Sequence, residues 1–140
     1  MGAEFDPWHE LGRHTDVAVV IGDPGPGALG SVDYASRIIT LAPDLLQRER
    51  RTTLTHELIH LERGPASAVG VRREEATVEL EAARRLIDID ELVSAAKWTD
   101  DVHELALELC VDEAAVLVRL RHLDDDERAS LARARRDREG

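Results

Sequence analysis

The stretch His56-Glu57-Leu58-Ile59-His60 places two imidazoles four residues apart. On a helix this spacing brings both rings to one face, because a turn takes about 3.6 residues. A carboxylate, that of Glu57, lies between them. Two His that hold a zinc ion, with a Glu that accepts a proton from the attacking water, are the pattern of zinc-dependent peptidases. The stretch therefore predicts a metal-binding helix, and the remaining chain is interpreted as its scaffold.

The residues around the motif favour a helix. Leu54, Leu58 and Leu61 recur at helical spacing and mark one buried stripe. Gly64-Pro65 is expected to end the helix, because glycine favours the conformation that follows a last helical turn. The motif is thus predicted on an amphipathic helix that packs against the rest of the protein.

A catalytic zinc site needs a third protein ligand and one open coordination position. A longer His-rich version of the motif would require Gly at position 63 and His at position 66, where this chain has Arg63 and Ala66. A glutamate from the helix predicted over about residues 72–87 is therefore the expected ligand, which gives a His2Glu set.

Four glutamates of that helix are candidates: Glu74, Glu75, Glu79 and Glu81. Glu74 and Glu81 are expected to face solvent, whereas Glu75 and Glu79 border the apolar stripe. A carboxylate beside a packed face is costly unless it is paired or bound to metal. We expect Glu75 to be the third ligand, with Glu79 as the alternative.

Composition restricts the class of protein. The chain has 140 residues, 43% apolar and 34% charged, which suits one globular domain. A net charge of −11 argues against nucleic-acid binding, since phosphate contacts need a basic surface. No apolar run is long enough for a membrane span, and the N-terminal residues do not resemble a secretory signal. With a single cysteine, these features predict a cytoplasmic protein.

Hydrophobic patterning predicts an α+β fold. Short β-branched runs indicate strands over residues 17–21, 30–34 and 37–41, and their order favours a small antiparallel three-stranded sheet packed on the motif helix. The C-terminal part is predicted to be all helical, over about 91–97, 102–109, 113–122 and 128–138. Residues 1–140 are interpreted as a single zinc-metallopeptidase-like domain. Residues 5–64 supply the sheet and motif helix, residues 65–125 the third-ligand helix and a helical pair, and residues 126–140 a charged tail.

Residues 102–120 have the cadence of a helix-turn-helix, which raises the alternative of a DNA-binding protein. The second helix of this pair begins with Asp112 and Glu113, whereas helices that read the major groove carry Arg, Lys, Asn or Gln there. We interpret the pair as a structural buttress. Cys110, at the turn, is expected to be a small buried hydrophobic residue.

Two segments together resemble the ImmA/IrrE family of metallopeptidase domains, of the actinobacterial or phage type. They are Leu54-Thr-His-Glu-Leu-Ile-His-Leu-Glu-Arg-Gly64 and Arg73-Glu-Glu-Ala-Thr-Val-Glu-Leu-Glu-Ala-Ala-Arg-Arg-Leu-Ile87. The family glutamate falls on Glu75, while Glu79, Glu81 and Asp88 depart from the family pattern. The resemblance covers about residues 5–125. It implies a zinc peptidase with a small sheet on the motif helix that cleaves a cytoplasmic regulator, typically a DNA-binding repressor.

These observations together predict a zinc-dependent endopeptidase. His56, His60 and Glu75 would hold Zn²⁺, and Glu57 would be the catalytic base. Tyr34 and His103 are both open as donors to the developing oxyanion. The alternative is a zinc-binding protein-interaction module with little or no proteolytic activity. The expected partner is a protein substrate, with no direct nucleic-acid or membrane contact, and no oligomeric state is predicted.

Overall fold

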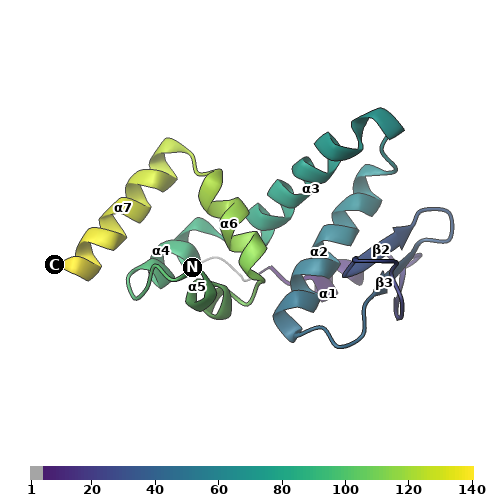
Figure 1. Cartoon of the computed structure of the whole chain (residues 1–140), viewed down its shortest axis with the longest axis horizontal. Helices are drawn as coiled ribbons and strands as arrows, with labels where there is room; N and C mark the ends of the chain where they lie inside the picture. The colour runs from purple at the N-terminus through teal and green to yellow at the C-terminus, as the bar shows by residue number, and fades with distance from the viewer. Residues whose placement is uncertain (1–4) are drawn as a thin grey trace.

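A small sheet and the helix that carries the two histidines occupy one end of the molecule, and the last helix occupies the other (Figure 1). The computed structural model describes residues 5–140. The first four residues of the N-terminal stretch that was compared with a secretory signal lie outside this range. In chain order the elements are α1 (Pro7–Leu11), β1 (Ala18–Ile21), β2 (Gly30–Asp33), β3 (Ile38–Leu41), α2 (Gln47–Arg63), the short 3-10 turn η1 (Ala68–Gly70), α3 (Val71–Leu86), α4 (Ile89–Ala96), α5 (Val102–Leu109), α6 (Glu113–Arg121) and α7 (Asp125–Glu139).

The predicted α+β class is confirmed, but the prediction of an antiparallel sheet is wrong. The strand order is β1-β3-β2, with β1 parallel to β3 and β2 antiparallel to β3. β3 is the central strand, and its Ile39 and Leu41 are fully buried. Residues 22–29, a glycine- and proline-rich segment between β1 and β2, are too long for a tight hairpin. They carry the chain past the position that β3 occupies, so that β2 pairs with the far edge of β3 and not with β1.

A tight turn joins β2 to β3. The Asp33 carboxylate accepts hydrogen bonds from the backbone N–H groups of Ala35 and Ser36, at 3.0 and 3.1 Å. Arg37 adopts a left-handed conformation, with φ of 61°, as the chain enters β3. Local hydrogen bonds of this kind are the reason why aspartate favours turns.

The sheet packs on the motif helix α2. Leu54, Leu58 and Leu61 of α2 are buried in one cluster with Ile39 and Leu41 of β3. The predicted leucine stripe is thus the face of α2 that covers the sheet. Gly64, with φ of 82°, follows α2, and its N–H donates to His60 O at 2.9 Å.

Arginine side chains tie α2 to the turn between α5 and α6. Arg51 Nη1 donates to Leu109 O and Cys110 O, at 3.2 and 2.9 Å, and its Nη2 donates to Phe5 O at 2.8 Å. Arg48 Nη1 donates to Val111 O at 3.4 Å. The guanidinium groups therefore bind the carbonyl groups of residues 109–111, at the end of α5 and in the turn that follows it.

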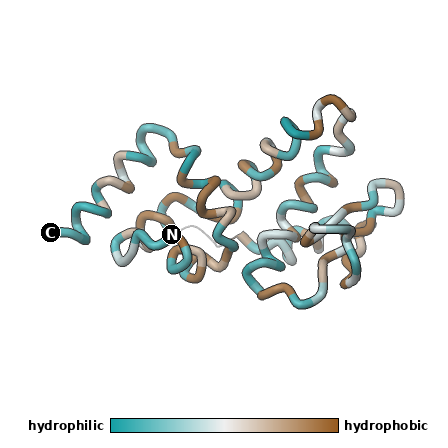
Figure 2. Tube along the Cα trace, viewed as in Figure 1, coloured by the Kyte–Doolittle hydropathy of each residue, from teal (hydrophilic) through white to brown (hydrophobic). Residues whose placement is uncertain are grey.

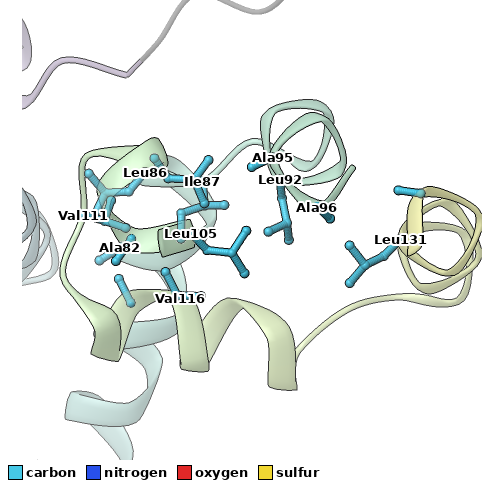
Figure 3. Packing of buried hydrophobic residues seen from close by; sticks show 14 of the residues in the cluster. Ala82, Leu86, Ile87, Leu92, Ala95, Ala96, Leu105, Val111, Val116 and Leu131 are labelled. Carbon is cyan, nitrogen blue, oxygen red and sulfur yellow. The ribbon is translucent and has the colours of Figure 1, made fainter. Parts of the chain in front are cut away.

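The C-terminal helices pack around a second core (Figure 3). Leu86 and Ile87 at the end of α3, Leu92 of α4 and Leu105 of α5 are buried together, and Leu131 of α7 lies against α4. α7 is mostly hydrophilic along its length (Figure 2), and only Leu131 and Ala134 of it are buried. The residues expected as a charged tail thus form a full helix that docks through a narrow apolar side.

Cys110 is exposed, so the expectation of a buried hydrophobic residue is wrong. It follows α5 in a left-handed conformation, with φ of 57°. This geometry turns the Cys110 side chain outward and presents its carbonyl to Arg51 instead. Within residues 5–140, no helix combines the length and the apolar character that a bilayer crossing requires.

Candidate metal centre

Three side chains from two helices converge in front of α2. His56 Nε2 lies 2.6 Å from Glu75 Oε1, and His60 Nε2 lies 3.0 Å from Glu75 Oε2. The two ring nitrogens are 3.1 Å apart. α2 and α3 run side by side as a hairpin (Figure 1), which brings Glu75, near the start of α3, over the motif. The structure therefore brings together the three residues predicted as ligands.

The donor set and its spacing suit a zinc ion. Zinc binds imidazole nitrogen and carboxylate oxygen at about 2.0–2.2 Å, so two ligands of a tetrahedral site lie about 3.3 Å apart. The observed separations of 2.6, 3.0 and 3.1 Å are slightly shorter. His56, His60 and Glu75 are all half-buried, so protein covers one side of the group and solvent can reach the other.

Glu57 lies beside this group and is buried, with 7% of its surface exposed. Burial raises the pKa of the Glu57 carboxyl to about 7, and the negative charge of Glu75 adds to the rise, while His56 opposes it. Burial also lowers the pKa of His60, with a further contribution from His56. A carboxyl whose pKa lies near neutrality can accept a proton and release it again, as a general base and acid must.

The other glutamates of α3 lie outside the group of three. Glu74 pairs with the Arg63 guanidinium, and Glu81 accepts a hydrogen bond from Arg85 at 2.7 Å. The bond from Arg63 lowers the pKa of Glu74. Glu79 is exposed and lines the neighbouring cleft, although its carboxylate does not join the two histidines.

The two open candidates for the oxyanion donor differ in position. Burial raises the pKa of the Tyr34 phenol, and the charges of Glu57, Glu74 and Glu75 raise it further, which places Tyr34 within electrostatic reach of the site. His103 is on α5, where its Nδ1 lies 2.8 Å from Glu113 Oε1 on the exposed surface. Tyr34 thus interacts with the charges of the site, and its role as an oxyanion donor stays a prediction.

A cleft of about 400 Å³ adjoins the candidate metal centre. His56, Glu57 and Glu75 belong to its lining, so the cleft reaches the candidate metal centre. The other lining residues come from the start of β2 and the two residues before it, from α2 and α3, and from α6 with its N-cap: Ala28, Leu29, Gly30, Thr52, Thr53, Glu79, Ala82, Ala83, Asp112, Ala114, Ala115 and Val118.

Gly30, the first residue of β2, lies against α2 at the edge of this cleft. A Cβ atom at Gly30 would be 2.5 Å from Thr53 Cγ2 and 3.3 Å from Glu57 Cγ. Only glycine lets the strand approach the helix this closely. The sequence offered a signal for this residue, because a glycine at the start of a predicted strand often marks a close backbone approach.

The contribution of α6 to the cleft was missed from the sequence. Its first turn carries Ala114 and Ala115, and its N-cap is Asp112, whose carboxylate accepts a hydrogen bond from Ala115 N at 2.8 Å. Burial raises the pKa of Asp112. A pair of helices interpreted as a buttress thus also shapes the space beside the motif.

A second group of metal-binding type occurs within the described residues, between α1 and α2. His14 Nε2 is 3.9 Å from both Glu10 Oε1 and Glu62 Oε1. Arg85 already pairs with both Glu62 oxygens, at 3.2 and 2.8 Å, so the Glu62 carboxylate is engaged elsewhere. His56, His60 and Glu75 therefore remain the stronger candidate.

No protein-family model, curated protein or solved structure matches the chain.

Proposed function

We propose that this protein is a zinc-dependent endopeptidase. The observation that carries the proposal is the convergence of His56, His60 and Glu75 beside the buried carboxyl of Glu57. A structural zinc site would not require a general base at this position, and catalytic sites keep three protein ligands with a fourth position open. The adjoining cleft gives a peptide access to the same side chains.

His56, His60 and Glu75 would hold the ion, and a bound zinc ion polarises a carbonyl and activates water for attack. Glu57 would accept a proton from the attacking water as its oxygen bonds to the peptide carbonyl carbon. The same carboxyl would then deliver that proton to the amide nitrogen as the C–N bond breaks. Tyr34, which the charges of Glu57 and Glu75 reach, is our candidate to donate a hydrogen bond to the oxygen that gains charge. Water is consumed, and one acid and one amine are released.

The proposed substrate is a cytoplasmic regulatory protein of the repressor type. This part of the proposal is supported by the resemblance of the two motif helices to the ImmA/IrrE family. The acidic start of α6, with Asp112 and Glu113, supports a protein partner in preference to nucleic acid, because phosphate groups would be repelled there.

The proposal is tested with purified protein, wild type and Glu57→Gln, each loaded with zinc. Zinc content is measured by elemental mass spectrometry, and hydrolysis is measured on a peptide library prepared from a bacterial proteome. We expect both proteins to bind one zinc ion, and only the wild type to cleave, with a loss of at least about 100-fold in Glu57→Gln. Glu108→Gln, an exposed carboxylate of α5, is the matched control and should cleave normally.

Two outcomes separate the alternatives. A Glu57→Gln variant that cleaves at the wild-type rate would refute the proposed base. A wild-type protein that binds zinc but cleaves no peptide would favour the zinc-binding interaction module instead.

A further inference from the structure

A second cavity, of about 650 Å³, lies between α1 and the start of α2. It shares no lining residue with the cleft beside the candidate metal centre. The described residues of its lining are Phe5, Asp6, Trp8, Gln47, Arg50 and Arg51. A role for this cavity is therefore separate from the proposed peptide hydrolysis.

Arg50 brings an unsatisfied donor to this cavity. Its Nε is buried and has no hydrogen-bond partner among residues 5–140. Buried polar groups in folded proteins nearly always have a partner, so an exception needs a physical explanation. An oxyanion is the acceptor that a guanidinium group binds best, because two parallel N–H groups can each donate to one oxygen.

The charges around Arg50 also favour an anion. Arg51 adds a second guanidinium to the lining, and its hydrogen bonds to backbone carbonyl oxygens fix its position. The Asp6 carboxylate is engaged as the N-cap of α1, where it accepts a hydrogen bond from Trp8 N at 2.9 Å. The described lining thus contains two cationic groups and one anionic group, although the chain as a whole has a net charge of −11.

Aromatic side chains indicate what the anionic group is attached to. The chain has one Phe, two Trp and one Tyr, and two of these four, Phe5 and Trp8, line the cavity. Trp8 is 45% exposed, so part of its indole surface is available to stack on another ring. A cavity of about 650 Å³ is also much larger than a single carboxylate or phosphate group.

We propose that this cavity binds a small aromatic molecule that carries a carboxylate or phosphate group. The Arg50 guanidinium would donate hydrogen bonds to the oxyanion, Arg51 would add positive charge, and Trp8 would stack on the ring. The inference adds a ligand site to the opposite end of the helix from His60, and no covalent bond changes there.

Trp8 serves as the reporter of binding in the purified full chain. A Trp98→Phe background removes the other tryptophan, which is 82% exposed, so that all tryptophan emission comes from Trp8. Phenyl phosphate and benzoate are titrated while this emission is recorded. We expect a saturable change with at least one of them. Its affinity should be at least about tenfold higher than that of inorganic phosphate, which lacks the ring, or of benzyl alcohol, which lacks the charge.

Substitutions locate the ligand. Arg50→Gln removes the guanidinium and should weaken binding about tenfold or more. Arg50→Lys keeps the charge without the paired N–H groups and should weaken it by a smaller factor. Arg72→Gln, an exposed arginine of α3 outside the lining, is the matched control and should bind as the parent does. Trp8→Leu, measured by saturation-transfer NMR of the ligand, should also bind more weakly.

Circular dichroism melting of each variant establishes that it is folded, and if Arg50→Gln does not fold, Arg50→Lys and Trp8→Leu decide the question. The inference is overturned if neither aromatic ligand changes the Trp8 emission saturably, or if inorganic phosphate binds as tightly as they do. It is also overturned if the folded Arg50 variants bind as the parent does, since the anion would then lie elsewhere, for example at a zinc ion. None of these results depends on peptide cleavage, so failure here is distinguishable from failure of the proposed function.

Discussion

Glu75 Oε1 lies 2.6 Å from His56 Nε2, although 19 residues separate them in the chain. If Glu75 is the third ligand, Glu75→Ala should lower zinc affinity by more than about 100-fold, because it removes one of three protein ligands. Zinc per chain is measured by elemental mass spectrometry after dialysis against a chelator. Glu79→Ala is the matched control and should keep its zinc. The reverse result would make Glu79 the ligand.

Gly30 gives a prediction about packing. A Cβ at this position would meet Thr53 Cγ2 at 2.5 Å, so Gly30→Ala should destabilise the fold by about 1–3 kcal/mol. The double variant with Thr53→Ser removes that methyl group and should recover part of the loss. Urea unfolding measures both. Gly22→Ala is the control, because its Cβ would lie 3.8 Å from the nearest atom, Thr40 Cγ2. Equal effects at Gly22 and Gly30 would contradict the argument.

Local patterns predicted the motif helix well, and long-range pairing was the part that they could not predict. The 3.6-residue periodicity of Leu54, Leu58 and Leu61 is a property of one segment, and it led to α2 and to its buried face. The parallel pairing of β1 with β3 depends on how residues 22–29 cross the sheet, which no local signal encodes.

The candidate site likewise has parts that local sequence patterns predict and parts that depend on long-range packing. His56, Glu57 and His60 share one helix turn, and Glu75 could be chosen from its place on the next helix. The cleft could not be anticipated, because it requires α6 to pack on α3. Cys110 was misjudged because its exposure follows from a left-handed turn and not from its hydrophobicity.

The ion pair between Arg119 and Glu127 predicts a dependence of stability on pH. Arg119 is buried, with 3% of its surface exposed, and its Nη1 and Nη2 lie 3.2 and 2.6 Å from the Glu127 oxygens. The Arg119 guanidinium lowers the pKa of Glu127 from 4.5 to about 2. A carboxyl with a lowered pKa in the folded state stabilises fully above its unfolded pKa, and it loses this contribution as pH falls from about 4.5 to about 2.

Glu127→Gln should therefore cost about 3 kcal/mol at neutral pH, because it leaves the Arg119 charge buried without its partner. The cost should shrink as the pH falls through that window. Urea unfolding of both proteins at several pH values measures the difference. Glu108→Gln, an exposed carboxylate, should show no such trend, and a cost that stayed constant from pH 7 to pH 2.5 would refute the pairing argument.

Cys110 offers a stabilising substitution. A residue with a Cβ in the left-handed region is strained, and glycine is not. Since φ at Cys110 is 57° and its side chain is exposed, Cys110→Gly should raise the free energy of unfolding by about 1 kcal/mol. Cys110→Ala keeps the Cβ and should bring no such gain. Thermal unfolding of the two variants separates the backbone effect from the loss of the thiol.

The cleft is lined by α2 and α3 on one side and by α6 on the other, and the order of these helices in the chain has a consequence for biosynthesis. The three candidate ligands are complete once residue 75 has been made, whereas α6 extends to Arg121 and the guanidinium of Arg51 finds its carbonyl partners only at Leu109 and Cys110. The residues of the candidate metal centre are therefore synthesised before α6, which completes the lining of the cleft. In the order of synthesis, the groups that would bind an ion precede the surface that would contact a peptide.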